Sequence, residues 1–297
     1  RLEGAPYVAV DTEFLREKTY WPKLCLVQVA YDDEAAAIDP LAKDIDLDPL
    51  FNLMDDESVL KVFHSASQDM EVFFSVAGRV PEPVFDTQVA AMVAGYGEQV
   101  GYATLAAQIA GVTLDKSSQI TDWSIRPLSD RQIAYALGDV THLCTIYEEL
   151  DERLEESGRI SWVSEEMAAL TDTSSYNADP NLAYRRVRIR RPSRKVLAIL
   201  REIVAWREET AQRRNLPRNW VIRDDALVEI ATHAPKNVAD LSRVRGLRGN
   251  AAKGRDGEAL LKAVQRALDM PQSEWPEIPP RRPPIRGHEA LVALLQT

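Results

Sequence analysis

The chain has 297 residues, of which 45% are hydrophobic, and a formal net charge of −10 at neutral pH. This length fits one large or two ordinary domains, and the hydrophobic share is sufficient for a buried core. We expect neither secretion nor a membrane partner, because no signal peptide is visible and no apolar run reaches the roughly 18 residues of a span. A cytoplasmic protein is therefore expected.

Charge is distributed unevenly along the chain. Residues 1–170 hold 31 acidic and 12 basic residues, a net of −19, whereas residues 171–297 hold 15 acidic and 24 basic residues, a net of +9. An acidic half beside a basic half indicates a metal-using catalytic unit next to a unit that binds polyanions. The two cysteines, Cys25 and Cys144, lack metal-ligand spacing and are interpreted as small apolar residues.

The first half alternates short apolar runs with helical patterns. The segment SASQDMEVFFSVAG has apolar residues at helical spacing and predicts a helix that ends at Gly78. Ser129 is the expected N-cap of a long helix over residues 129–156. Strands are predicted at 6–11, 24–31, 35–40, 59–64 and in PVFDTQ, and other helices at 47–55, through AAMVAG and at 102–110. This order predicts an α/β domain with a mixed sheet over residues 1–170.

The second half is predicted to be a connector followed by helices. Residues 171–192 form the connector, which is polar at first and then arginine-rich in the run RRVRIRR. An all-helical unit is predicted over residues 193–272, with Asp224 or Asp225 as the cap of the helix ALVEIATHA. Residues 273–297 are predicted to be a stiff proline-rich linker and the start of a second, truncated helical module.

Acidic residues in three separated segments are the candidates for catalysis. Asp11 and Glu13 lie two apart in an apolar run, so in a strand they point to one side. Tyr135 and Asp139 lie four apart in a helical pattern and share one helix face. With Asp69, four carboxylates brought together would repel each other unless they hold divalent metal. Oxygen ligands favour Mg²⁺ or Mn²⁺, and two ions about 3.5–4 Å apart can flank a phosphate.

The segments that carry these residues resemble the motifs of a known family. VDTEF, HSASQD and DWSIRPLSDRQIAYALGDV, in this order, are similar to the three exonuclease motifs of ribonuclease D, a member of the DEDD superfamily of 3′→5′ exonucleases. The resemblance spans residues 5–156 and implies an RNase H-like fold. Tyr135, four residues before Asp139, marks the subtype that has tyrosine in the third motif.

The resemblance also implies an activity and a set of roles. The protein would be a 3′→5′ exoribonuclease that releases nucleoside 5′-monophosphates, acting on precursor tRNA 3′ ends without an obligate protein partner. Two divalent ions, Mg²⁺ or Mn²⁺, would be held by Asp11, Glu13, Asp69 and Asp139. One ion would activate a water that Tyr135 positions, and the other would stabilise the leaving 3′ oxygen.

Asp86 competes with Asp69 for the second-motif position. It lies in VFDTQVA, which outwardly resembles VDTEF. The family pattern places the aspartate five residues after the histidine of HSASQD, which selects Asp69. We therefore expect Asp86 to cap or orient the helix that follows it.

Five residues near the motifs are candidate substrate contacts: Thr12, Phe14, His64, Trp123 and Arg126. The ring of Phe14 suits stacking on a terminal base, as aromatics do in single-strand sites; packing in the core is the alternative. His64 ends a predicted strand and is placed to touch substrate. For Trp123 and Arg126, in the loop before the third motif, support of the fold is the alternative.

The helical half resembles a second known module. NLPRNWVIRDDALVEIA and DLSRVRGL are similar to an HRDC domain, which accompanies ribonuclease D and RecQ-type helicases and binds nucleic acid. Two other functions stay open at this point. One is a DNA 3′→5′ exonuclease, because the 2′-hydroxyl contact that distinguishes RNA cannot be read from sequence. The other is a non-catalytic nucleic-acid-binding protein with a decayed site.

Overall fold

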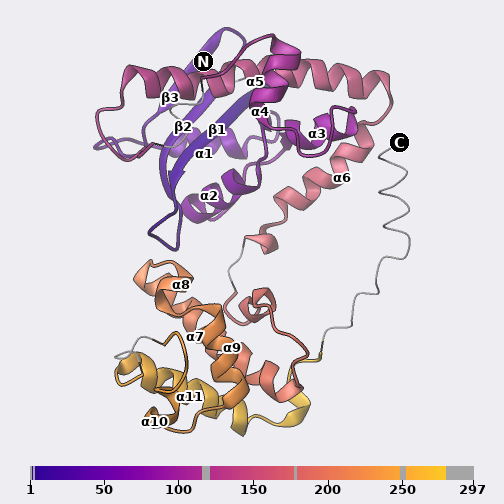
Figure 1. Ribbon diagram of the computed structural model, residues 1–297. Coiled ribbons are helices and arrows are strands. Elements are labelled where there is room, and N and C mark those ends of the chain that lie inside the picture. The colour runs from indigo at the N-terminus through magenta and orange to yellow at the C-terminus, as the bar shows by residue number, and fades with distance from the viewer. Residues whose placement is uncertain (1, 3, 116–120, 177–178, 248–251, 279–297) are drawn as a thin grey trace. The chain divides into compact units, whose positions relative to one another are not determined.

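The chain folds into two compact units (Figure 1). The first contains residues 1–178 together with 211–217, and the second contains residues 179–210 and the chain from Arg218 onward. The computed structural model describes residues 2, 4–115, 121–176, 179–247 and 252–278. Among these, no helix is long and apolar enough to cross a membrane.

A five-stranded mixed sheet forms the centre of the first unit (Figure 1). The strand order is β3–β2–β1–β4–β5, in which β1, β2 and β3 pair antiparallel while β4 and β5 run parallel to β1. The strands are β1 (Tyr7–Leu15), β2 (Lys23–Tyr31), β3 (Glu34–Ile38), β4 (Leu60–Phe63) and β5 (Val84–Asp86). The predicted α/β class and mixed sheet are confirmed.

Helices surround this sheet. They are α1 (Asp48–Asp55), α2 (Ser67–Ala77), α3 (Thr87–Val93), α4 (Tyr102–Leu105), α5 (Asp130–Glu156) and α6 (Ile160–Thr171). The predicted helix over 102–110 changes type, because a π-helical turn at Ala106–Ala110 continues α4. A short 3₁₀ turn follows α6 at Thr173–Ser175.

Two predicted helix ends are confirmed. Helix α2 ends at Gly78, whose φ of 73° is a left-handed conformation that glycine adopts without a Cβ penalty. Helix α5 begins after Ser129, which forms a reciprocal capping box with Gln132. These caps fix where α2 and α5 start and stop, and both helices carry predicted site residues.

Alternation along β1 assigns its side chains to two layers. Ala9 is buried in the core that α5 helps to form, whereas Val10 is buried in the core formed with α1 and α2. Since successive strand residues point to opposite faces, Asp11 and Glu13 follow Ala9 and point to the α5 side. Thr12 follows Val10 and points to the α2 side.

The second unit is helical and has one core of its own. Its elements are the 3₁₀ turn η4 (Ala183–Arg186), α7 (Arg194–Arg214) up to Thr210, α8 (Arg218–Val221), α9 (Asp224–His233), α10 (Val238–Leu241), α11 (Arg255–Asp269) and the 3₁₀ turn η5 (Gln272–Glu274). The predicted all-α architecture of this half is confirmed. The proposed terminal module lies outside the described residues from residue 279 onward.

One predicted cap is wrong. Asp224 and Asp225 lie inside the first turn of α9, and Arg223 occupies the N-cap position without a side-chain hydrogen bond. Asp224 instead accepts from the buried guanidinium of Arg207 at 2.5 Å. Negative charge in the first turn still suits the helix dipole, so the aspartates favour the helix start without capping it.

Part of the predicted connector is built into the second unit. Ala183 and Val187 are each only 6% exposed and belong to its core, and Ile189 packs against that core. Apolar residues at 187 and 189 point inward while their arginine neighbours are exposed. The arginine run is therefore anchored to a folded surface.

Candidate active site

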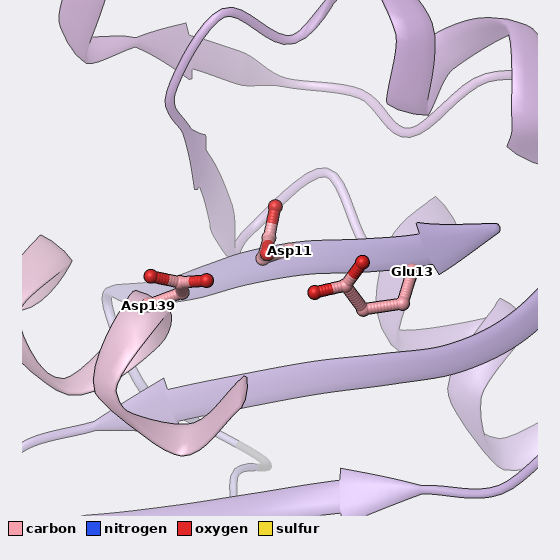
Figure 2. A group of neighbouring side chains, drawn as sticks. All are labelled: Asp11, Glu13 and Asp139. Carbon is pink, nitrogen blue, oxygen red and sulfur yellow. The ribbon is translucent and has the colours of Figure 1, made fainter. Parts of the chain in front are cut away.

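Three of the predicted acidic residues meet at one point. Asp11 and Glu13 extend from β1, and Asp139 reaches toward them from α5 (Figure 2). One carboxylate oxygen from each lies within 4.8 Å of the others, and all three residues are half-buried. The β1–β2 register shifts between Glu13 and Phe14, and such irregularities commonly re-aim side chains beside functional sites.

The electrostatics of this cluster show that its charges oppose one another. Burial raises the pKa of Asp11 to about 6. Burial and the Asp11 carboxylate raise the pKa of Asp139 to about 7. Burial, then Asp11, Asp139 and Asp69, raise the pKa of Glu13 to about 9. Three carboxylates that disfavour one another's charged form, with oxygens this close together, make a donor set suited to a divalent cation.

Asp69 lies beside this cluster and is hydrogen-bonded to Thr12. It is buried in the first turn of α2, and the Thr12 hydroxyl donates to its Oδ1. Burial and the charge of Asp11 raise its pKa well above the ordinary range. Its oxygens are not among the three-carboxylate group, so a ligand role for Asp69 stays a prediction. Thr12 is only 6% exposed and its hydroxyl donates to Asp69. A substrate contact by Thr12 stays a prediction.

Tyr135 borders the cluster, one turn before Asp139 on α5. Burial, the charges of Asp139 and Glu13, and a hydrogen bond to Asp139 all raise its pKa above the ordinary value. Its ring packs on that of Trp123, with centroids 6.1 Å apart and an interplanar angle of 38°. The hydroxyl therefore stays protonated at neutral pH, and the ring that carries it packs on the buried Trp123.

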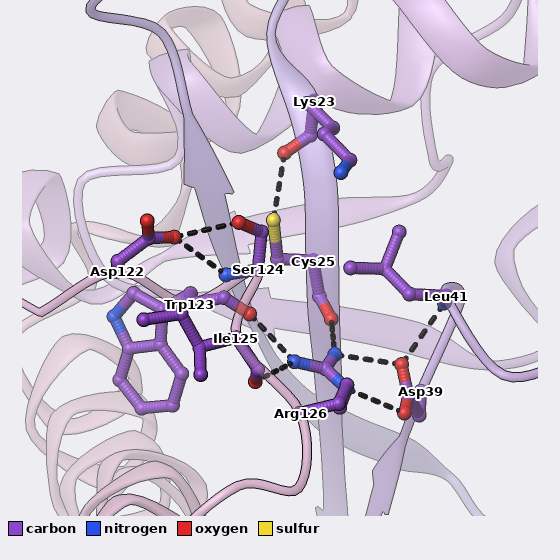
Figure 3. Close-up of polar contacts among 9 residues, drawn as sticks. All are labelled: Lys23, Cys25, Asp39, Leu41, Asp122, Trp123, Ser124, Ile125 and Arg126. Atoms are coloured by element: carbon purple, nitrogen blue, oxygen red, sulfur yellow. Dashed lines mark hydrogen bonds and ion pairs between the residues drawn. The ribbon is translucent and has the colours of Figure 1, made fainter.

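Arg126 ties together three segments around Trp123 (Figure 3). Its guanidinium donates to both oxygens of Asp39 and to the carbonyl oxygen of Cys25, each at 2.7 Å. It also donates to the carbonyl oxygens of Trp123 at 2.7 Å and Ile125 at 2.9 Å. Trp123 itself is only 2% exposed. For Trp123 and Arg126, the sequence left open either contact with substrate or support of the fold. These contacts favour support of the fold.

Asp86 has the role expected for it. It is the N-cap of α3, where its Oδ1 accepts from the backbone N–H of Gln88 at 2.8 Å. Its carboxylate also accepts from the backbone N–H groups of Ser65 and Ala66, just before α2. The prediction that Asp86 caps or orients the following helix is confirmed, and the same carboxylate orients the start of α2.

The two remaining candidate contacts are partly enclosed. Phe14 is half-buried and packs against the core with α1 and α2, in agreement with the packing alternative. His64 Nδ1 lies 2.9 Å from the Thr87 hydroxyl, and burial lowers the pKa of the imidazole. His64 Nε2 is buried with no hydrogen-bond partner among the described residues. A substrate contact by this nitrogen stays a prediction.

Two residues near the cluster were not identified from the sequence. Tyr102 donates to the carbonyl oxygen of Gly138 at 3.0 Å, and burial and the charges of Asp139 and Asp11 raise its pKa. Gln28 is the cross-strand partner of Asp11 and is fully buried, and its side-chain amide has no hydrogen-bond partner among the described residues. Only the strand register and the packing of α4 on α5 reveal them, and neither carries a local sequence signal.

Comparison with known proteins identifies related families for both halves of the chain. A family model described as a 3′-5′ exonuclease matches residues 1–155, and an HRDC domain model matches residues 196–264. Ribonuclease D of Gluconacetobacter diazotrophicus is 49% identical over 296 residues, covering 100% of this chain and 75% of the relative. Ribonuclease D of Jannaschia sp. is 51% identical over 300 residues, covering 100% of this chain and 78% of the relative.

The chain belongs to the ribonuclease D family. It is accordingly a hydrolase of the 3′-5′ exonuclease class, which argues against a non-catalytic binding protein. Among solved structures, Escherichia coli RNase D matches with a TM-score of 0.85 and 33% identity over 98% of this chain and 78% of its own. Brucella melitensis NrnC with bound Mg²⁺ matches with a TM-score of 0.54 and 27% identity, over 65% of this chain and 94% of its own.

Proposed function

We propose that this ribonuclease D-family protein removes nucleotides from the 3′ end of RNA with two divalent ions. The observation that carries the proposal is the meeting of Asp11, Glu13 and Asp139 beside the hydroxyl of Tyr135. Asp69 is proposed as the fourth acidic residue, because it is close enough to Glu13 to raise its pKa. The Mg²⁺ bound to B. melitensis NrnC supports a divalent ion for a site of this kind.

The donor set fits such ions. Buried like charges are costly unless a cation neutralises them, and carboxylate oxygens suit Mg²⁺ and Mn²⁺. When bound, the ions would supply Lewis-acid stabilisation to the phosphodiester and lower the pKa of water. In their presence, Asp11, Glu13 and Asp139 would stay ionised and hold the ions beside the terminal phosphodiester.

Tyr135 is proposed to orient the attacking water. Because its raised pKa keeps the phenol protonated at neutral pH, its hydroxyl acts as a hydrogen-bonding group and not as the base. Packing against Trp123 and the bond to Asp139 fix its direction. Attack by water on the terminal phosphodiester releases a nucleoside 5′-monophosphate and leaves a new 3′-hydroxyl on the shortened strand.

Structured RNA with a 3′ tail, such as precursor tRNA, is the proposed substrate. The support is the relation to E. coli RNase D, described as an exoribonuclease involved in structured RNA processing. The HRDC module and the basic second half suit binding to the phosphate backbone.

Matched 5′-labelled RNA and DNA strands, incubated with Mg²⁺, Mn²⁺ or EDTA, test the proposal. We expect RNA to shorten one nucleotide at a time from its 3′ end in either metal, no reaction in EDTA, and nucleoside 5′-monophosphates as products. Faster shortening of DNA than of RNA would favour the DNA exonuclease alternative. Undiminished activity in EDTA would contradict the role of the ions.

A further inference from the structure

The arginines at positions 185–191, a run that begins within η4 and ends before α7, differ from the other arginines of the second unit. Several of those others pair with carboxylates, as Arg194 does with Glu277 and Arg218 with Glu208. Along the run, five arginines are exposed, and none has an ion pair among the described residues: Arg185, Arg186, Arg188, Arg190 and Arg191. An exposed block of unpaired positive charge is available to an external anion.

Three of these arginines line a groove of about 1300 Å³ in the second unit: Arg185, Arg188 and Arg191. Apolar and aromatic side chains, including Tyr184 and Ile278, line it as well. The one carboxylate in its lining, Glu277, already pairs with Arg194 at 3.0 Å. The groove therefore carries an excess of positive charge beside an aromatic ring, the combination that single-stranded nucleic-acid grooves use.

Both walls of the groove are anchored before any ligand arrives. On one side, Ala183 and Val187 are buried in the core, which fixes the backbone of the segment that carries Arg185 and Arg188. On the other, Arg194 donates to the carbonyl oxygen of Trp275 at 2.8 Å, next to Glu277 and Ile278. Fixed walls reduce the entropy cost of ordering the binding surface.

We propose that this groove, which we call the arginine groove, binds the phosphate backbone of the RNA substrate, with Arg185 and Arg188 contacting phosphates. The proposal rests on the proposed function and adds where the RNA is gripped outside the exonuclease unit. Guanidinium groups suit phosphate oxygens, because they present several N–H donors in a planar fork. The acidic first half, net −19 over residues 1–170, makes a separate cationic contact necessary for tight binding.

The arginine run supplies its own matched control. Arg185 and Arg188 line the groove, whereas Arg186 and Arg190 belong to the same run, are equally unpaired among the described residues, and are not in the groove lining. Arg185→Gln with Arg188→Gln and Arg186→Gln with Arg190→Gln each remove two charges. The test measures binding of the full chain to a 5′-fluorescein single-stranded RNA in EDTA, by anisotropy, over a range of salt concentrations.

We expect the groove pair, Arg185→Gln with Arg188→Gln, to reduce the slope of log affinity against log salt by about 1.4, because each lost phosphate contact removes about 0.7. At 0.1 M salt this change corresponds to about 25-fold weaker binding. The control pair should stay within about threefold of the parent, because exposed charges without direct contact are screened. Arg185→Lys with Arg188→Lys should restore most of the salt slope. Thermal melting shows that each variant is folded.

Equal losses in the two pairs would overturn the proposal, because net charge alone would then explain the affinity. Unchanged affinity in the groove pair would overturn it as well. Hydrolysis of a 5′-phosphorylated dinucleotide in Mg²⁺ separates this result from the proposed function. Hydrolysis of the dinucleotide reports on the exonuclease site alone. If the parent chain fails to hydrolyse it, the proposed function is contradicted. The arginine groove is tested separately, by the RNA-binding measurement.

Discussion

At the residue scale, the site is defined by carboxylates that raise one another's pKa. Asp11, Glu13 and Asp139 would each suit an exposed position, yet burial and proximity raise the pKa of Glu13 to about 9 and of Asp139 to about 7. Such an arrangement is unfavourable for stability without a cation and favourable for binding one. The same groups therefore link metal binding, pH and stability.

Stability of the metal-free protein should fall as pH rises from 6 to 9. In the unfolded chain these carboxyls ionise near pH 4, while the folded site retains protons until about pH 7 to 9 at Asp139 and Glu13. Over this window the folded state binds more protons, so the free energy of unfolding decreases with pH. Melting in EDTA at several pH values measures this, and Mg²⁺ should reverse the loss. If a Glu13→Gln variant loses stability with pH as steeply as the parent, the raised pKa of Glu13 is not the cause of the loss.

Asp139→Asn should remove hydrolysis and leave the protein folded. The amide keeps the shape but loses a charged oxygen, so we expect activity to fall by at least about 10²–10³-fold, the scale for one preorganised electrostatic contact. Asp86→Asn is the matched control. Since Asp86 caps α3, its loss should cost about 1 kcal/mol of stability while activity is largely kept. Near-parental turnover by Asp139→Asn, or loss of turnover by a folded Asp86→Asn, would contradict these assignments.

Tyr135→Phe should lower kcat far more than it weakens RNA binding. The ring that packs on Trp123 is kept, so stability should hold, whereas the hydroxyl that we propose orients the attacking water is lost. Losing a positioned group of this kind typically costs about 10²–10⁴-fold in rate. Single-turnover kinetics separate this step from product release. An unchanged single-turnover rate would assign Tyr135 to packing alone.

At the element scale, α5 and the segment before it bring the third motif to β1. The capping box of Ser129 sets where α5 begins, and Ala136 and Val140 bury the stripe that presses the helix onto the sheet. Arg126 joins the preceding loop to β2 and to the end of β3. The direction of Tyr135 and Asp139 thus depends on contacts that neither residue makes.

Arg126→Lys should lower both stability and kcat. Lysine keeps the charge but cannot reproduce the two-pronged bond to Asp39 together with the carbonyl contacts. We expect a loss of about 2 kcal/mol, the scale for hydrogen bonds to charged groups. Arg131→Lys is the control, because its pair with Asp115 is 67% and 64% exposed and should contribute under about 1 kcal/mol. Urea unfolding and kcat are measured for both variants. Equal losses in Arg126→Lys and Arg131→Lys would contradict the role of Arg126 in supporting the fold.

At the scale of the whole molecule, an acidic exonuclease unit is joined to a basic helical unit. Residues 1–170 carry a net charge of −19 and residues 171–297 a net of +9. The division is not simple along the chain, because residues 211–217 belong to the first unit. There, the side-chain oxygen of Asn215 accepts from the backbone N–H groups of Tyr20 and Trp21, each at 3.1 Å.

A chain that ends at residue 178 should keep the chemistry and lose affinity for structured RNA. Short single-stranded RNA should still be degraded in Mg²⁺ or Mn²⁺, whereas the plot of log affinity against log salt should become shallower, since cationic contacts are lost. The melting temperature should fall, because Asn215 no longer holds Tyr20 and Trp21. Equal affinity for a tRNA precursor and an equal salt slope in both chains would exclude the second unit as the RNA grip.

The sequence by itself determined the elements, the order of the motifs and the class of each half. These properties are local: period-two and helical patterns, the cap at Ser129 and the glycine end at Gly78 act within a few residues. The expected role of Asp86 followed in the same way from its place before a helix. The wrong prediction of an N-cap at Asp224 or Asp225 shows where local patterns stop being sufficient. Asp224 is bound by Arg207, which lies seventeen residues earlier in the chain.

Only the tertiary structure decided which of the candidate residues lie together. The meeting of Asp139 with Asp11 and Glu13 needs α5 packed on one face of the sheet, while Asp69 meets Thr12 on the other. Gln28 becomes the neighbour of Asp11 through strand register alone. Register and packing are set by contacts far apart in sequence, so no local pattern encodes them.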